Sequence, residues 1–236
     1  MMSALNYSII SMELSRRVTA LLNMKQAELH AIKWTDGEAN IDTGFSALAC
    51  KCTLEAWETM RKENPLYTDT RLEISGPDVK MKFITGETTF PDKTELKSGT
   101  SKIIPGSTIG KLNINQAMIY CLRPTAPSTT YECRYSQYHT AMGGGSYETF
   151  QDRTPRPLIN FDKMHTSFAA VEYVHKEKVA WIPHYAACAL NRVQEHYNSW
   201  QESLTQHIID EYLRRSQPES ILARRSMLME TADGMN

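Results

Sequence analysis

Asp78, Glu95 and Lys97 are the residues of this chain whose types and spacing point to chemistry. Glu95 and Lys97 are two positions apart, so in an extended strand their side chains emerge on the same face. Alternating apolar residues and lysines over 79–83, followed by Thr85-Gly86, predict a hairpin in which Asp78 falls opposite Glu95 or one of the two residues before it. We therefore expect two carboxylates and an amine within about 5 to 8 Å of one another.

Two carboxylates at that separation repel each other unless a divalent cation lies between them. A hard cation such as Mg²⁺ or Mn²⁺ prefers oxygen ligands of this kind. Such an ion polarises a phosphodiester and lowers the pKa of a bound water, and a nearby lysine orients that water or stabilises the charge that develops on phosphorus. The three residues therefore predict metal-dependent phosphodiester hydrolysis.

The order and spacing of these residues resemble a known family. Gly76-Pro77-Asp78 followed by Glu95-Leu96-Lys97 is similar to the motif of the PD-(D/E)xK nuclease superfamily, the restriction-endonuclease-like proteins. Gln116 and Tyr120 are similar to the QxxxY element of the RecB-like branch, and the predicted helix over 112–121 would carry them. The resemblance covers roughly residues 45–135.

This resemblance implies a role for each matching residue. Asp78, Glu95 and the backbone carbonyl of Leu96 would be metal ligands, and Lys97 would be the catalytic lysine. Gln116 and Tyr120 would complete the catalytic set by supporting the substrate or the metal ligands.

Three further residues are candidate ligands on the predicted N-terminal helices. In some members an acidic residue from a preceding helix joins the metal, for which Glu55 or Glu58 is available, and branches that use a helical histidine would use His30. The second Pro-Asp pair, at Asp92, is rejected as the motif aspartate because it lies three residues before Glu95 with no hairpin to bridge.

A nucleic-acid surface is predicted around the hairpin and the strand after it. Lys and Arg total 26 against 27 Asp and Glu, so a polyanion must meet a local patch and not a wholly basic protein. Lysines crowd residues 78–111, and the loop Ser98–Gly110 is rich in Gly, Ser and Thr. The predicted nucleic-acid contacts are Lys80, Lys82, Lys102, Lys111, Arg134 and Tyr135.

Composition places the chain among globular proteins. Its 236 residues are 41% hydrophobic, which is enough for a full core. Five cysteines without a CxxC pair indicate neither a disulfide framework nor a zinc ribbon, and no apolar run approaches the length of a membrane span. We expect a soluble intracellular protein, in the cytoplasm or in a host cell, that contacts no membrane and is compatible with a homodimer.

The apolar periodicity predicts an α/β (α+β) fold, with a mixed central β-sheet flanked by helices. Helices are expected over 8–33, 45–60 and 112–121. Strands are expected at 70–74, 79–83, 131–135 and 158–161. A returning strand that carries Phe90 and Leu96 is expected to end at Ser98-Gly99, with a bulge or edge irregularity at Pro91-Asp92. We expect a nuclease-like core at 1–165, a largely helical C-terminal part at 166–216, and a disordered tail at 217–236.

The function expected from these residues is that of a divalent-metal-dependent endonuclease, acting on DNA in preference to RNA, of the restriction type or from a virus or mobile element. Two alternatives stay open. One is a non-enzymatic nucleic-acid-binding or virion structural protein, in which Glu95 merely pairs with Lys97. The other is an RNA endonuclease of the cap-snatching type, which would favour a histidine ligand such as His30.

Overall fold

The structure is a computed structural model, and it describes residues 4–34, 43–108, 113–142, 148–151, 154–170, 172–177, 194, 197–198 and 200–210. The chain forms two compact units, Met1–Tyr185 and Ala186–Asn236. Within the described ranges, no helix is both long enough and apolar enough to cross a membrane.

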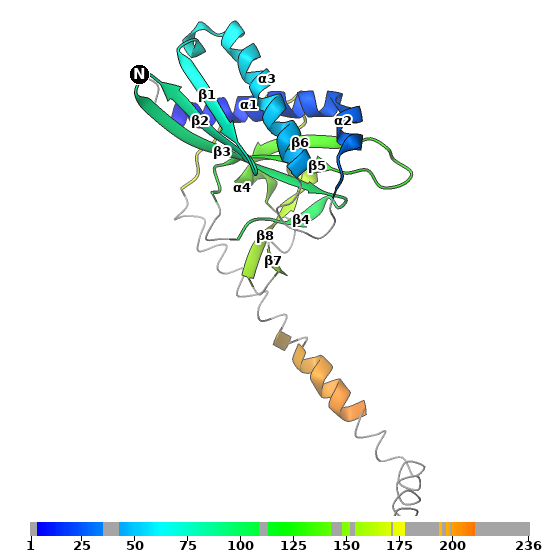
Figure 1. Ribbon diagram of the computed structural model, residues 1–236. Helices are drawn as coiled ribbons and strands as arrows, with labels where there is room; N and C mark the ends of the chain where they lie inside the picture. Colours follow the sequence, from blue (N-terminus) through cyan, green and yellow to red (C-terminus); the bar gives the residue numbers. More distant parts are fainter. Residues whose placement is uncertain are drawn as a thin grey trace, which may run out of the picture. The chain divides into compact units, whose positions relative to one another are not determined.

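A five-stranded mixed sheet organises the first unit (Figure 1). In spatial order its strands are β1 (Thr70–Ser75), β2 (Val79–Thr85), β3 (Thr88–Gly99), β5 (Ala117–Leu122) and β6 (Glu132–Gln137). Strands β3 and β5 are parallel, and all other neighbours are antiparallel. The predicted mixed α/β class is confirmed, with five strands in the central sheet.

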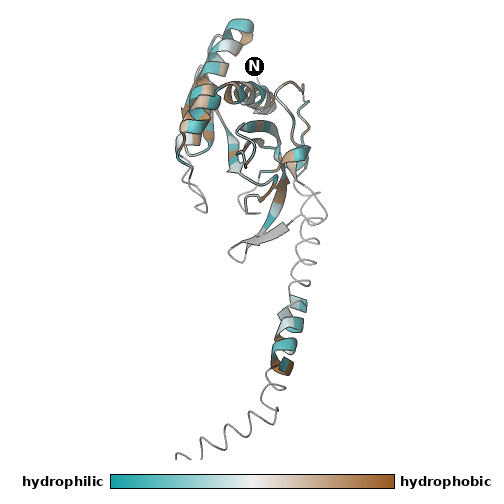
Figure 2. Cartoon of the chain, turned by 90° about the vertical axis from the view of Figure 1, so that its right-hand side faces the viewer, coloured by the Kyte–Doolittle hydropathy of each residue, from teal (hydrophilic) through white to brown (hydrophobic). Residues whose placement is uncertain are grey.

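Three helices cover one face of this sheet: α1 (Ala4–Met24), α2 (Gln26–Ala31) and α3 (Thr43–Glu63). The first predicted helix is therefore found as two, divided at Lys25, and the second is found with its end before Asn64-Pro65. Along these helices hydrophobic residues alternate with hydrophilic ones (Figure 2), as expected for helices with one face against a core.

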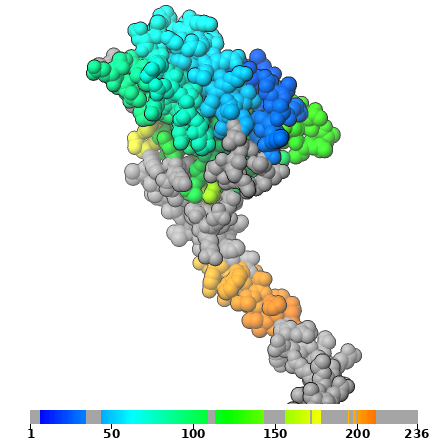
Figure 3. All heavy atoms as spheres, viewed as in Figure 1, coloured from blue at the N-terminus to red at the C-terminus, as the bar shows by residue number. Residues whose placement is uncertain are grey.

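The main core lies between the helices and the sheet. Val79, Met81 and Phe83 point from β2 toward the helices and are almost fully buried. Trp57 of α3 packs edge-on against Phe83, with ring centroids 5.6 Å apart. In the space-filling view α3 and β1 to β3 lie side by side (cyan to green, Figure 3).

The β2–β3 hairpin forms, with a register at one end of the predicted range. Val79 pairs with Thr94, which places Asp78 opposite Glu95. The turn is Gly86-Glu87, one residue later than predicted, and Gly86 has a φ of 59°, a conformation that favours glycine.

No bulge occurs in this hairpin, so that part of the prediction is wrong. Pro91 pairs with Lys82 in the same regular register. Strand β5 pairs with β3 only from Thr94 onward, so β3 has one neighbour at Pro91, and a residue without an N–H fits there.

The predicted helix over 112–121 is also wrong, since the described part of this segment is a turn followed by the strand β5, an inner strand of the main sheet.

The structure also contains a second sheet, of three strands, that was not predicted. It consists of β4 (Ile103–Pro105), β8 (Thr154–Asn160) and β7 (Glu148–Gln151). The predicted strands at 131–135 and 158–161 correspond largely to β6 and to the end of β8.

The second face of the main sheet is only half covered. A smaller core on this face joins Met118 and Tyr120 of β5 to the short helix α4 (Tyr138–Ala141), to β8 and to the 3₁₀ turn Phe161–Lys163. Over β2 the same face stays exposed and carries Lys80 and Lys82. The sheet therefore has a covered half and an open half.

Residues 166–177 are not helical where they are described, contrary to the prediction. Instead, side-chain amides satisfy the backbone of this segment. Gln137 both accepts from the Val174 N–H (2.8 Å) and donates to its carbonyl (3.0 Å), and Asn115 does the same for Lys176 at 2.8 and 2.9 Å. These side-chain hydrogen bonds satisfy backbone N–H and C=O groups that a helix would have paired with each other.

In the second unit, residues 200–210 are helical, as predicted for this stretch. Five apolar side chains between positions 197 and 209 are exposed: Tyr197, Trp200, Leu204, Ile208 and Ile209. The predicted tail at 217–236 lies outside the described residues.

Asp92 lies on the helix side of β3, where its carboxylate accepts hydrogen bonds from the Ser11 hydroxyl and the Lys93 N–H, both at 2.7 Å. Burial raises the pKa of Asp92 above its ordinary value, although these two hydrogen bonds act in the opposite direction. The folded state therefore holds the Asp92 proton more firmly than the unfolded chain. Below the ordinary pKa of about 4 this carboxyl therefore costs the folded state no stability. The folded state loses stability as the pH rises through the raised pKa of Asp92.

Replacing Asp92 by Asn removes this cost, so the stability of Asp92→Asn relative to the wild type should increase between about pH 4 and pH 7. Urea denaturation of both proteins at several pH values measures the difference. A difference that stays constant or falls over this interval would contradict the argument.

Candidate active site

Asp78 begins the site, at the junction between the Gly76–Asp78 turn and β2. Its φ is 59°, and among the described residues it is the only non-glycine with a positive φ. This conformation costs an aspartate about 1 kcal/mol or more and is found at functional positions. The side chain of Asp78 is directed across the hairpin, where its Oδ1 accepts a hydrogen bond from the Leu96 N–H at 3.0 Å.

Glu95 is the centre of the site. It lies on β3 with its side chain 9% exposed, on the sheet face opposite the helices. Lys97, two residues further on the same face, places its Nζ 2.8 Å from Glu95 Oε1. The structure therefore brings Asp78, Glu95 and Lys97 together across the hairpin.

Lys93 also belongs to this site, although sequence reasoning did not select it. Its Nζ lies 2.8 Å from Asp78 Oδ2 and 2.8 Å from Glu95 Oε2, so one ammonium joins the two carboxylates. The alternation Lys93, Glu95, Lys97 puts all three side chains on one strand face. That alternation was the available signal for Lys93.

Two polar side chains from other segments complete the surroundings of Glu95. The Ser107 hydroxyl donates to Oε1 at 2.7 Å, and Gln116, directly before β5, donates to Oε2 at 3.5 Å. Gln116 is thus near the predicted catalytic residues without a helix to carry it. Ser107 comes from the loop after β4, and no pattern in the sequence pointed to it.

The charges of the two lysines control the ionisation of Glu95. Burial alone would raise the pKa of Glu95, but Lys97 and Lys93 more than offset this and lower it to about 2. The pKa of Lys93 is raised, because its hydrogen bonds to Asp78 and Glu95 outweigh the effect of burial. Glu95 and Lys93 therefore carry their charges at neutral pH.

The donor set fits a Mg²⁺ or Mn²⁺ ion. The ammonium of Lys93 contacts Asp78 and Glu95 at once, so the two carboxylates face one cationic group. The Leu96 carbonyl points to the same edge of β3 as its N–H, and so toward Asp78. Within the described residues no third acidic, histidine or cysteine side chain joins them, and Mg²⁺ commonly binds one or two carboxylates while it keeps several waters.

The additional ligands suggested on the helices are not brought to this site. Glu55 and Glu58 are exposed on α3, where they pair with Lys25 and Arg61. His30 packs edge-on against Tyr131, with centroids 4.9 Å apart. These residues lie on the helix side of the sheet, whereas Glu95 faces the other way.

Tyr120 has a structural position, not a catalytic one. It pairs with Lys97 across β3 and β5 but is fully buried in the smaller core, where burial raises its pKa. Its hydroxyl donates to the Ser101 carbonyl. Tyr120 therefore anchors the connection between β3 and β4.

The predicted nucleic-acid contacts divide into three groups. Lys80 and Lys82 lie exposed on the open half of the sheet, on the same face as Glu95. Lys102 and Arg134 are engaged with Asp162, at 3.0 and 3.8 Å, and Arg134 also stacks on Phe161.

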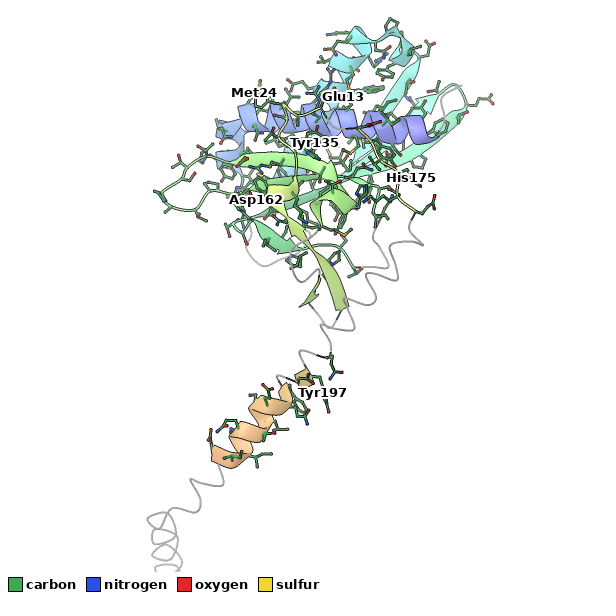
Figure 4. The ribbon with its side chains drawn as sticks, turned by 180° about the vertical axis from the view of Figure 1, so that it is seen from behind. Glu13, Met24, Tyr135, Asp162, His175 and Tyr197 are labelled. Carbon is green, nitrogen blue, oxygen red and sulfur yellow. The ribbon has the colours of Figure 1, made fainter. Side chains whose placement is uncertain are left out.

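The third group holds the remaining two predicted contacts, Tyr135 and Lys111. Tyr135, labelled on β6 beside α1 in Figure 4, is buried, and its hydroxyl donates to the Ala169 carbonyl at 2.5 Å. A buried ring cannot stack on a base, so Tyr135 is corrected to a core residue. Lys111 lies outside the described residues.

No model of a protein family, no curated protein and no solved structure matches this chain.

Gly106 fixes the position of Ser107. An added Cβ there would lie 2.1 Å from the Tyr138 hydroxyl and 2.9 Å from the Pro157 carbonyl oxygen, while the Ser107 N–H bonds to the same hydroxyl at 2.6 Å. We expect Gly106→Ala to destabilise the protein by about 1–3 kcal/mol, measured by thermal or urea denaturation.

Gly76→Ala is the matched control, because the nearest atom to its added Cβ would be 3.8 Å away. Equal stability of Gly106→Ala and the wild type would show that the loop does not need this close approach.

Proposed function

We propose that this protein is a divalent-metal-dependent endonuclease that hydrolyses phosphodiester bonds. The observation that carries the proposal is the convergence of Asp78 and Glu95 on one cation position, with Lys97 on the other oxygen of Glu95. Two carboxylates around a cation, with a lysine beside them, form an arrangement suited to phosphodiester chemistry. The similarity to the PD-(D/E)xK motif supports the same reading.

Each side chain has a distinct task in this proposal. Asp78, Glu95 and the Leu96 carbonyl hold Mg²⁺ or Mn²⁺, which supplies a polarised phosphate and an activated water when bound. Lys97 orients the attacking water or stabilises the negative charge that develops on phosphorus. Ser107 and Gln116 keep Glu95 in position by hydrogen bonding.

The open half of the sheet is the proposed path for the substrate. Lys80 and Lys82 lie exposed one strand away from Glu95, so they can contact phosphates beside the reacting bond. The covered half is closed by the smaller core. We propose DNA in preference to RNA, in line with the family that the motif resembles, with the restriction-type enzymes and the nucleases of viruses or mobile elements as contexts.

Cleavage of plasmid DNA and of a structured RNA in the presence of Mn²⁺ tests the activity. We expect the wild type to cleave DNA, and Lys97→Met to lose about a hundredfold or more of the rate, because the lysine acts on charge formed in the transition state. Retained cleavage by Lys97→Met, or no cleavage of either substrate by the wild type, would refute the proposal.

Asp78→Asn separates loss of the ion from loss of the fold. Asparagine tolerates a positive φ and keeps an oxygen that can accept the Leu96 N–H, but it lacks the charge that binds the cation. This variant should melt close to the wild-type temperature without metal and should lose the stabilisation that Mn²⁺ gives to the wild type.

A second candidate function is nucleic-acid binding without catalysis, including a structural role in a virion. The observation in its favour is that Lys93 and Lys97 already neutralise both carboxylates without an ion. In that case the lysines of the open face would bind a backbone and the site would only hold the hairpin together.

Lys80→Gln combined with Lys82→Gln tests the binding surface itself. The double variant should weaken DNA binding and reduce the salt dependence of the affinity by about two phosphate contacts. Lys51→Gln with Lys62→Gln, on the exposed side of α3, is the control of equal charge. Similar losses in both double variants would indicate non-specific electrostatics. Binding by a wild type that never cleaves would favour the second candidate.

A further inference from the structure

Lys93 occupies the position that a divalent cation would need. Its Nζ is equally distant, at 2.8 Å, from one oxygen of Asp78 and one oxygen of Glu95. Those same oxygens are the proposed metal ligands. Mg²⁺ sits about 2.0–2.1 Å from its oxygen ligands, so the ion and the ammonium cannot both lie between the two carboxylates.

The ammonium has a clear function when no ion is present. Without it, Asp78 and Glu95 would repel each other across the hairpin, and Glu95 would be a buried carboxylate with Lys97 as its only ion pair among the described residues. Lys93 also holds the carboxylate of Asp78, whose backbone has the unusual positive φ. The arrangement of the ligands is therefore maintained by the chain itself.

Lys93 can also leave this position. Its side chain is 36% exposed, and across the hairpin Lys93 pairs with Lys80, on the open half of the sheet. A long flexible side chain at this place can turn its ammonium into solvent while its stem stays on β3. The Ser107 and Lys97 contacts use the other oxygen of Glu95 and do not need to change.

We propose that Lys93 is a built-in competitor of the metal ion: it holds Asp78 and Glu95 together while the ion is absent, and it must be displaced when the ion binds. This inference rests on the proposed function, since it concerns the same ligands. It adds that the affinity for metal is set by the release of a lysine as well as by the carboxylates. Lys93 is thus a positioning residue and not a catalytic one.

The test compares the dissociation constant for Mn²⁺, measured by titration calorimetry without nucleic acid, in the wild type and in Lys93→Met. Lys93→Met should bind Mn²⁺ roughly tenfold more tightly or better, as expected when two partly buried ion pairs no longer have to be broken. Without metal the variant should melt at a lower temperature than the wild type, because the two carboxylates lose their shared partner.

Lys82→Met is the matched control, since Lys82 lies on the same strand face as Lys80 but pairs with Pro91. It removes the same charge from the open face and should change the Mn²⁺ affinity by less than about threefold. Lys93→Gln, with a shorter neutral side chain, should repeat the gain if Lys93→Met does not fold.

The outcomes separate this inference from the proposed function. Tighter Mn²⁺ binding by the Lys93 variants supports the competition even if the wild type cleaves no nucleic acid. Unchanged or weaker binding overturns it, even if the wild type is an active nuclease. Absence of Mn²⁺ binding in the wild type and in both Lys93 variants overturns it as well.

Discussion

The charge of Glu95, kept almost out of water, is the constraint on which the candidate site depends. A carboxylate in that position costs several kcal/mol unless it is paired and hydrogen-bonded. Its partners come from three segments: Lys93 and Lys97 from β3, Ser107 from the loop after β4, and Gln116 from the turn directly before β5. Separating β5 and the Ser107 loop from β3 would remove the hydrogen bonds of Ser107 and Gln116 and leave Glu95 with the two lysines of its own strand.

The hairpin could be predicted because its information is local. Alternation in β2 and a nearby glycine in the turn limit the register to a few positions, and the observed one places Asp78 opposite Glu95. The same alternation contained Lys93, whose role needed only the observation that it shares a face with Glu95. Ser107 could not be predicted, because its position depends on the contact of Gly106 with Tyr138 and Pro157, which are distant in sequence.

The segment around Gln116 and Tyr120 shows why the rest of the fold was harder to predict. Residues 117–121 are apolar and buried on both faces of the sheet, and such a run has no alternation that distinguishes a strand from a helix. A spacing of four residues also fits both structures, since it returns to the same side of a helix and to the same face of a strand. Here the parallel pairing with β3, which no local pattern reveals, decided the outcome.

The unequal covering of the sheet explains how the site can be both shielded and accessible. On the helix side Asp92 is held by α1, and on the other side the smaller core closes over β5 around Tyr120. Glu95 lies at the border of this core, where the apolar surroundings on one side strengthen its interactions with charge. On the other side the open strands β1 and β2 leave room for a polyanion beside Lys80. Glu95 therefore combines a shielded side, which strengthens its ion pairs, with an accessible side, and the proposed phosphodiester chemistry would use both.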